Sequence, residues 1–578
     1  MHACVKVQKL AQAAAKHTET CGGTVHSASL LAKLASLGAA GKFPNNAERD
    51  IHRSLAAANL KLDACIQWVQ VRFQVPSTGR VESKPLPVLF PDKFAEAIWS
   101  MGEEYFQHFF LGGMDQDLKQ FWQHVGGRSL WGKSLKDAAG AKQDLSRLIP
   151  LTFYGDDVNT YKSTEIGTVS VMSWSCDYIL ANQSPLERYF LICAFSEYHE
   201  CPGTWADFGP QLAASFSRLV SDDRPWCKKG YRFCFSSITG DLKWIRQYFG
   251  MFNWKANEFC SYCNAVKRDP DGCVGRTLSD FSEDAEHRNV RIQHEDWLQS
   301  TSPAERHCFA VIPGFRYERC LFDPLHGQLL GTGKVTNGSV LVYMSERGFF
   351  GRVSGEYEEF LGRALSAAFK RFSAWNRRQE KPVTQARFTP SRLNRKGRTT
   401  FPCLQSKGAS SKAVTRWLAE EMEAVASNAA ATQLDKDVAT CICLYRDMLQ
   451  ALDSAPLLLD DASRQKIYML GMKHLQVYSN LRLRSSRTLG GPRALNRTCW
   501  LILPKHHYLY HLLTDTVFAD GLNPRFQTLF CGESFIGLMG RMSKACHRSS
   551  LSKRLLQRYQ IRFGLLLREI VPASWCEK

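Results

Sequence analysis

The feature that most constrains the fold is a short apolar run that ends in an acid. Residues 231–239 are rich in aromatic and β-branched side chains, and Gly240 and Asp241 follow them directly. Such a run indicates a buried strand, and ligands of open α/β sheets gather at the carboxyl ends of strands. A helical pattern comes next, and then the pair Cys260 and Cys263. We therefore predict an acid at the edge of a sheet, followed by two thiols.

A second strand ends in the same way nearer the N-terminus. Residues 148–154 form an apolar run that leads through a glycine into Asp156 and Asp157. The elements predicted between the two acidic ends are a strand at 166–174, a strand at 189–195 and a helix at 210–220. This order of strands and acids is typical of a ribonuclease-H-like core, in which the first and fourth strands are neighbours. Both acids are then expected to lie side by side.

The chain is too long for one ordinary hydrophobic core. With 578 residues, two to four domains are expected. The predicted parts are a helical N-terminal region at 1–143, a first core part at 144–263, a mainly helical insertion at 264–500 and a last core part at 501–578. The predicted fold class is α/β, with a ribonuclease-H-like mixed sheet that a large helical insertion interrupts.

The net charge of +19 makes polyanions the first candidate partners. Many of the cations lie in the segment 377–412, which three prolines keep extended. A solvated linker and a run of phosphate contacts both fit this composition. The candidate DNA contacts in this segment are Arg377, Arg378, Arg395, Lys396 and Arg398.

The 20 cysteines are scattered through apolar runs, and no leader pattern opens the sequence. We therefore expect reduced thiols in an intracellular protein rather than a disulfide framework. No run of 18 apolar residues occurs, so no membrane span is expected.

A third acid lies on a predicted helix at 531–544. At 100° per residue, Glu533 shares one face with the cations Arg541, Lys544 and Arg548, while the apolar side chains lie on the other. A carboxylate beside cations suits a metal ligand next to a phosphate backbone. An acid in a first helical turn also compensates the helix dipole, so both interpretations stay open.

Together, these motifs resemble the transposases of CACTA (En/Spm-type) cut-and-paste elements. The motifs that carry the resemblance are Gly155-Asp156-Asp157, Gly240-Asp241 with Cys260 and Cys263, the Asp323-x-x-His326 segment and Lys505-x-His507-x-x-x-His511. They are spaced motifs between about 145 and 565. The large subunit of the V(D)J recombinase is a more distant resemblance, with the same order of thiols and histidines.

The resemblance implies a catalytic triad of Asp156, Asp241 and Glu533 that holds two Mg²⁺ (or Mn²⁺) ions for strand cleavage and joining. Asp157 remains an alternative to Asp156 as the first acid. Asp323 and His326 would orient the scissile phosphate or a water, although an acid before a helix is equally a cap.

Thiolates suit Zn²⁺ rather than Mg²⁺. Cys260 and Cys263 present two sulfurs, and His507 and His511 lie four residues apart on one helix face, so together they would complete a Cys₂His₂ site. His506 competes with His507 for this role.

The function that the resemblance implies is metal-dependent DNA strand cleavage and strand transfer in the nucleus. Its partners would be transposon ends, target DNA and further copies of the same chain. A catalytically inactive, transposon-derived DNA-binding protein is the alternative, because the N-terminal region shows no zinc-finger pattern for reading DNA. A structure-specific nuclease ranks third.

Overall fold

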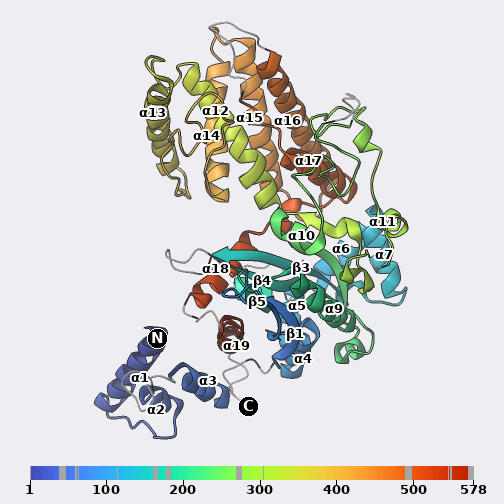
Figure 1. The fold of residues 1–578 in the computed structure, drawn as a ribbon, viewed down its shortest axis with the longest axis vertical. Helices are drawn as coiled ribbons and strands as arrows, with labels where there is room; N and C mark the ends of the chain where they lie inside the picture. Colours follow the sequence, from blue (N-terminus) through green and yellow to red (C-terminus); the bar gives the residue numbers. More distant parts are fainter. Residues whose placement is uncertain are drawn as a thin grey trace.

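The computed structural model shows a mixed α/β chain with one central sheet and many helices (Figure 1). It describes residues 2–37, 47–58, 62, 64–112, 115–159, 167–176, 184–268, 276–303, 305–487, 498–544, 546 and 550–570. A bundle of helices from α12 to α17 lies on one side of the sheet, and the N-terminal helices α1 to α3 lie at the opposite end of the molecule (Figure 1).

The central sheet has five strands in the order β5-β4-β3-β6-β7. They are β3 (Leu148–Asn159), β4 (Thr168–Cys176), β5 (Tyr189–Ser196), β6 (Arg232–Gly240) and β7 (Cys320–Phe322). β4 is antiparallel to both β3 and β5, whereas β3 pairs with β6, and β6 with β7, in parallel. The four strands expected from the sequence are confirmed, but the first does not end before the acids: β3 continues through Asp156 and Asp157, which both pair with β4, to Asn159. Residue 166, where the second was predicted to begin, lies outside the described residues.

The pairing of β3 with β6 places two glycines side by side. Gly155 pairs with Gly240 in register, and the Trp244 ring lies over both. A Cβ on Gly155 would lie 2.0 Å from Cζ2 of Trp244, and a Cβ on Gly240 would lie 2.7 Å from its Cε3. Trp244 is in the first turn of α10 (Leu242–Phe249), so this close approach fixes where the helix starts. Asp156 and Asp241, which follow the two glycines, are therefore held next to the point where the pairing of β3 with β6 ends.

The two faces of β3 are covered by different helices, because successive side chains point to opposite sides. Phe153 contacts Phe216 of α9 (Pro202–Leu219), the helix predicted at 210–220. Tyr154 and Val158 face α18 (Phe530–Ser543), in which Gly532 and Gly540 lie against them. Asp156 shares the side of Tyr154 and Val158, so its carboxyl group points towards α18.

Further helices and a hairpin extend the core around the sheet. The helices are α4 (Pro91–Met101), α5 (Glu103–Leu111), α6 (Asp115–Arg128), α7 (Leu130–Ala139), α8 (Pro185–Arg188), α11 (His294–Ser300) and α19 (Leu551–Glu569). Phe94 of α4 and Phe109 of α5 both contact Phe563 of α19, which also packs on β5. The N-terminal and C-terminal parts of the chain thus share one core.

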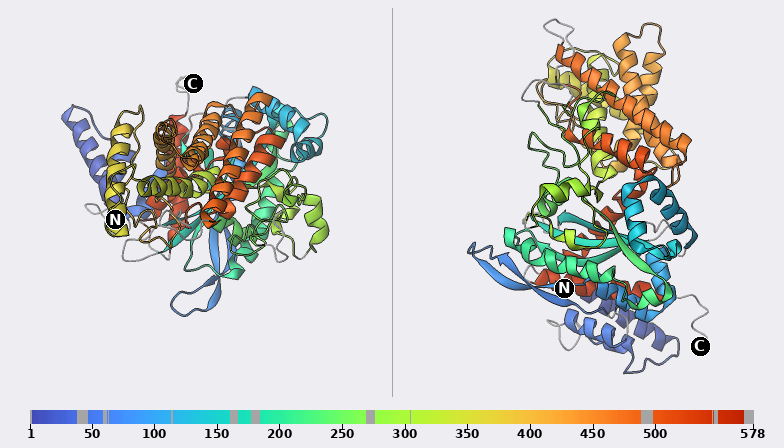
Figure 2. Two further views of the ribbon diagram at one scale, coloured as in Figure 1. Left: turned by 90° about the horizontal axis from the view of Figure 1, so that it is seen from above. Right: turned by 90° about the vertical axis from the view of Figure 1, so that its right-hand side faces the viewer.

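The N-terminal region differs from the helical expectation by a β-hairpin. β1 (Gln67–Gln74) and β2 (Val81–Val88) are antiparallel, and their turn projects from the body in Figure 2. Buried and exposed residues alternate along β1, which is the period of a strand with one covered face. The other elements of this region are α1 (His2–Thr20), α2 (Leu30–Ala35) and α3 (Ala47–Ala57).

The insertion has a hydrophobic core of its own. Its helices are α12 (Gly333–Glu346), α13 (Tyr357–Arg377), α14 (Gly408–Ala426), α15 (Gln433–Ser454) and α16 (Asp461–Arg487). A cluster of buried side chains from Val335 to Trp500 belongs to this body and is separate from the core around the sheet. The mainly helical character expected there agrees with these elements, and the domain limits stay a prediction.

Within the described residues, no helix is long and apolar enough to cross a membrane. No disulfide joins any of the cysteines that the structure describes.

The glycine pair generates a stability prediction. Replacing Gly155 with alanine forces its Cβ into the Trp244 ring, and we expect a loss of about 1–3 kcal/mol or more in the free energy of unfolding. Denaturant unfolding followed by tryptophan fluorescence measures this loss.

The matched control is Gly362→Ala in α13, where an added Cβ meets nothing within 4 Å. Because alanine is the better helix former, this variant should be neutral or more stable by up to about 1 kcal/mol. Equal stability of Gly155→Ala and the wild type would contradict the packing argument.

Candidate functional site

The first acid is buried among other carboxyl groups. Asp156 is only 6% exposed, and its Oδ1 accepts a hydrogen bond from the Asp157 N–H at 2.7 Å. Burial raises the pKa of Asp156 well above its usual range, and the nearby carboxylates of Asp241 and Glu533 raise it further. Two strands and α18 thus direct three carboxyl groups towards one place, which favours a bound cation.

The second acid sits at the start of a helix. Asp241 is the N-cap of α10, and its Oδ1 accepts the Trp244 N–H at 2.6 Å. The described side chains whose ligand atoms all lie within 4.8 Å of one another at this place are Asp156, His326 and Glu533. Asp241 therefore contributes charge to the group without belonging to its tightest part.

His326 joins the group from the segment that follows β7. Its Nε2 lies 3.4 Å from Oε1 of Glu533, and its Nδ1 lies 2.6 Å from Oδ2 of Asp323. Burial alone would lower the pKa of His326, but the hydrogen bond and charge of Asp323, together with the charges of Glu533 and Asp241, raise it. The imidazole is thereby held in one orientation beside Glu533.

Asp323 connects two distant parts of the chain. Its oxygens accept the N–H groups of Leu325 and His326, which begin the π-helix η8 (Leu325–Thr332). Its Oδ1 also accepts the N–H of Leu529, the residue before α18, at 3.0 Å. The helix-cap interpretation of Asp323 thus describes part of its role, and the bond to Leu529 also positions the helix of Glu533.

Asp157 is placed differently from Asp156. Its carboxylate forms an ion pair with Lys243 at 2.6 Å, and as the next residue of β3 it points to the opposite face of the sheet. Asp156, with its carboxyl group turned towards Glu533, is therefore the better candidate for the first acid.

A second group joins the thiols to the histidines of α17 (Pro504–His511). Cys260, Cys263, His507 and His511 offer four ligand atoms that all lie within 4.8 Å of one another. Cys263 Sγ lies 3.1 Å from Nε2 of His507, and Cys260 Sγ lies 3.3 Å from Nε2 of His511. His506 lies apart, with its ring tilted against that of Tyr478 at 4.5 Å between centroids. Two sulfurs and two nitrogens are the donor set of a structural zinc site.

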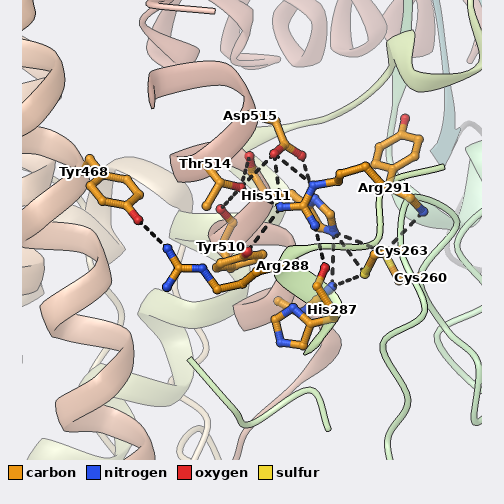
Figure 3. A network of polar contacts seen from close by, with 12 residues as sticks. Cys260, Cys263, His287, Arg288, Arg291, Tyr468, Tyr510, His511, Thr514 and Asp515 are labelled. Carbon is orange, nitrogen blue, oxygen red and sulfur yellow. Dashed lines mark hydrogen bonds and ion pairs between the residues drawn. The ribbon is translucent and has the colours of Figure 1, made fainter. Parts of the chain in front are cut away.

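The surroundings of this group fit a cation. The thiol of Cys260 and the imidazoles of His507 and His511 lower the pKa of Cys263, which favours its thiolate. Asp515 Oδ2 lies 2.7 Å from Nδ1 of His511, so the other nitrogen of that ring faces the sulfurs (Figure 3). In zinc sites, a carboxylate commonly accepts a hydrogen bond from the other nitrogen of a ligating histidine and so orients its ring.

The predicted DNA contacts fall into two surfaces. Arg541 and Lys544 are exposed on α18, beyond Glu533, and Arg548 lies outside the described residues. The basic segment 377–412 exposes Arg377, Arg378, Lys396 and Arg398.

Arg395 differs from its neighbours in the basic segment. It is fully buried, where it donates to the Tyr357 hydroxyl at 2.9 Å and lies 3.7 Å from the carboxylate of Glu346. A solvated linker would leave its cations exposed, but the Arg395 side chain is buried in the insertion. We therefore remove Arg395 from the DNA contacts.

Sequence reasoning missed the supporting residues of both groups. Asp515 follows His511 by one helical turn, a spacing that the sequence displays. The sequence does not indicate the packing role of Trp244, because that role depends on two glycines that are paired across strands.

No family model matches this chain, and no curated protein matches it. Among solved structures, the chain is similar to the Drosophila P element transposase strand transfer complex, at 10% sequence identity and a TM-score of 0.28. The match covers 73% of this chain and 77% of that chain. At this level of similarity it does not assign the chain to a family.

The thiol–imidazole group predicts bound zinc. We expect about one zinc per chain after purification without added metal, and near-complete loss of it in Cys263→Ser, because three donors hold zinc far more weakly than four. Metal content by mass spectrometry and thermal unfolding measure the change. In Cys443→Ser, a half-buried thiol of α15 outside the group, zinc should be retained. A wild-type protein without zinc would contradict the site.

The cluster of Asp156, His326 and Glu533 predicts that Mn²⁺ stabilises the protein. Because Glu533 adds negative charge beside Asp156, millimolar Mn²⁺ should raise the melting temperature of the wild type. The same addition should raise that of Glu533→Gln less, since one charged ligand is missing. Thermal scans in chelator and in Mn²⁺ make the comparison, and equal shifts in both proteins would contradict a cation site at Glu533.

Proposed function

We propose that this protein is a transposase-like enzyme that cleaves and joins DNA strands with two divalent metal ions. The observation that carries the proposal is the approach of Asp156 and Glu533, with His326, to within 4.8 Å, while Asp241 follows the strand next to that of Asp156. Mg²⁺ is the expected ion, because small hard cations prefer carboxylate oxygens and a phosphate supplies the remaining ones. We also propose that this chain is related to the CACTA (En/Spm-type) transposases.

The sheet supports a ribonuclease-H-like core. In the order of the chain, the first strand pairs with an antiparallel second strand on one side and with a parallel fourth strand on the other. The parallel pairing of these two strands ends at Gly155 and Gly240, so Asp241 directly follows the fourth strand, whereas Asp156 lies within the first strand, which continues to Asn159. The neighbouring first and fourth strands are the arrangement that the sequence pattern predicted for such a core.

The electrostatics support a divalent cation at these acids. A buried carboxyl group surrounded by like charges is unfavourable by itself, and Asp156 accordingly has a raised pKa. Perturbed groups of this kind gather at functional sites. A metal ion bound there would neutralise charge on the phosphate and activate the attacking hydroxyl or water.

The chain's own residues would orient the DNA. Asp323 fixes the imidazole of His326, whose Nε2 faces Glu533 and the place where a phosphate oxygen would sit. Arg541 and Lys544 lie along the same helix as Glu533 and are exposed, so they would contact the backbone next to the reacting phosphate.

The proposed zinc would act structurally. It would join the segment after α10, which carries the thiols, to α17, which carries the histidines. These two parts flank the insertion in the sequence, so such a link would hold the returning chain and α18 near the sheet.

The test is DNA cleavage in Mg²⁺ or Mn²⁺. Supercoiled plasmid measures nicking, and duplexes with 3′-hydroxyl ends measure joining into the plasmid. Asp156→Asn should lower both rates at least about 100-fold, because it removes a charged ligand whose metals supply several kcal/mol of transition-state stabilisation.

Asp157→Asn is the matched control. It neutralises the neighbouring acid, which pairs with Lys243, and should keep the rate within about threefold of the wild type. Nicking by Asp156→Asn at the wild-type rate would refute the proposal. DNA binding without cleavage by the wild type would support the inactive, DNA-binding alternative instead.

A further inference from the structure

One arginine joins the two sides of the thiol–imidazole group from outside. Arg291 is followed by Ile292, whose N–H donates to the carbonyl oxygen of Tyr262 at 3.0 Å. Tyr262 lies between Cys260 and Cys263 in the chain, so the backbone next to Arg291 is attached to the thiol side. The Arg291 side chain extends from there to the segment that carries the histidines (Figure 3).

The guanidinium group of Arg291 holds the carboxylate that orients His511. Its Nε donates to Oδ1 of Asp515 at 3.3 Å, and the Thr514 hydroxyl lies 2.8 Å from the same oxygen. The other oxygen, Oδ2, lies 2.7 Å from Nδ1 of His511. Because the Asp515 side chain is 43% exposed, packing alone does not fix its orientation. The contacts with Arg291 and Thr514 therefore decide which oxygen faces the imidazole.

The other donors of Arg291 also have partners. Its Nη1 donates to the carbonyl oxygen of His287 at 2.8 Å, and its Nη2 donates to the Tyr510 hydroxyl at 3.2 Å. The guanidinium carbon lies 5.4 Å from the centre of the Tyr510 ring. A planar group with partners in several directions is held in one orientation, whereas a lysine ammonium group offers no such fork.

The charges around the proposed zinc also balance with this arginine in place. Zn²⁺ with two thiolates and two neutral imidazoles carries no net charge. Asp515 adds one negative charge, and Arg291 supplies the matching positive charge. Without Arg291, the partly exposed carboxylate would be free to turn towards water, where it is better solvated.

We infer that Arg291 is a positioning residue of the zinc site. It fixes Asp515, and through Asp515 the ring of His511, so that the four donors are arranged before the ion binds. Removing an outer partner of this kind weakens metal binding by about 10- to 100-fold in known sites. The inference rests on the structural zinc of the proposed function, but zinc binding is measured without DNA.

The affinity for zinc tests this role, measured on the full chain by competition with a chromophoric chelator. Arg291→Met keeps a long side chain without its donors and should weaken zinc binding by about 10- to 100-fold. Arg291→Lys keeps the charge without the fork and should bind zinc with an affinity between those of Arg291→Met and the wild type. It provides the same comparison if Arg291→Met does not fold. Equal affinity in the wild type and the folded variants would overturn the inference.

A double-mutant cycle separates positioning from a general effect on the fold. Because Arg291 acts through the carboxylate, Arg291→Lys should weaken zinc binding little further in a chain that already carries Asp515→Asn. Loss of affinity by the same factor with and without Asp515→Asn would overturn the inference, since Arg291 would then act independently of the carboxylate.

Arg288→Met is the matched control. Arg288 lies three residues earlier and donates to the Tyr468 hydroxyl of α16 at 3.0 Å and to the carbonyl oxygen of Ser282 at 3.1 Å. This variant should bind zinc as tightly as the wild type, and a loss equal to that of Arg291→Met would overturn the inference.

The zinc measurements are separate from the cleavage assays. A wild type that binds no zinc would refute the zinc site and the inference together. Unchanged zinc affinity in the Arg291 variants would refute only the inference. A wild type that binds zinc but cleaves no DNA would refute the proposed enzyme, and the loss of zinc affinity in Arg291→Met would still support the role of Arg291.

Discussion

The close packing of Trp244 against two paired glycines is the constraint on which the site depends. Gly155 and Gly240 are neighbours on β3 and β6, and neither can carry a side chain while the ring lies over them. The ring belongs to the helix that Asp241 caps, so strand pairing, helix start and acid position are fixed together. The same glycines set Asp156 one residue beyond the pair, on the face that α18 covers. A single packing contact therefore determines where two of the three acids lie.

The burial of negative charge at this point has a consequence for the whole molecule. Three carboxyl groups that converge in a partly buried place destabilise the fold unless a cation or a proton compensates them. His326, held by Asp323, supplies one donor next to Glu533. Because Asp323 also accepts the N–H of Leu529 at the start of α18, the residue that holds the imidazole beside Glu533 also positions the helix of Glu533. Stability and the arrangement of the site are thus coupled through one aspartate.

Local patterns predicted the four strands, because strand composition and period are visible within ten residues. The end of the first strand was missed, since its pairing with β4 carries β3 through both acids to Asn159. The spacing of His507 and His511 likewise placed both rings on one face. What the sequence could not give were contacts set by tertiary packing: the Trp244 ring on its glycines, and the approach of His326 to Glu533. The burial of Arg395 was missed for the same reason, since composition alone does not distinguish a solvated cation from one that folds into a neighbouring core.

About 290 residues separate Asp241 from Glu533, yet both must reach one place. A flexible loop of that length would cost about 5 kcal/mol to close. The insertion avoids much of this cost because it folds around its own core, and the residues on its two sides meet, since Cys263 Sγ lies 3.1 Å from Nε2 of His507. Trp500 donates its N–H to Ser339 at 3.1 Å, and Lys505 donates to the carbonyl of His326. Because such contacts link the two sides of the insertion to each other, its helical body can be large while Asp241 and Glu533 stay close together. A shift of this body would act on the site first through Lys505 and His326, because they form the direct contact between the returning chain and the acidic group.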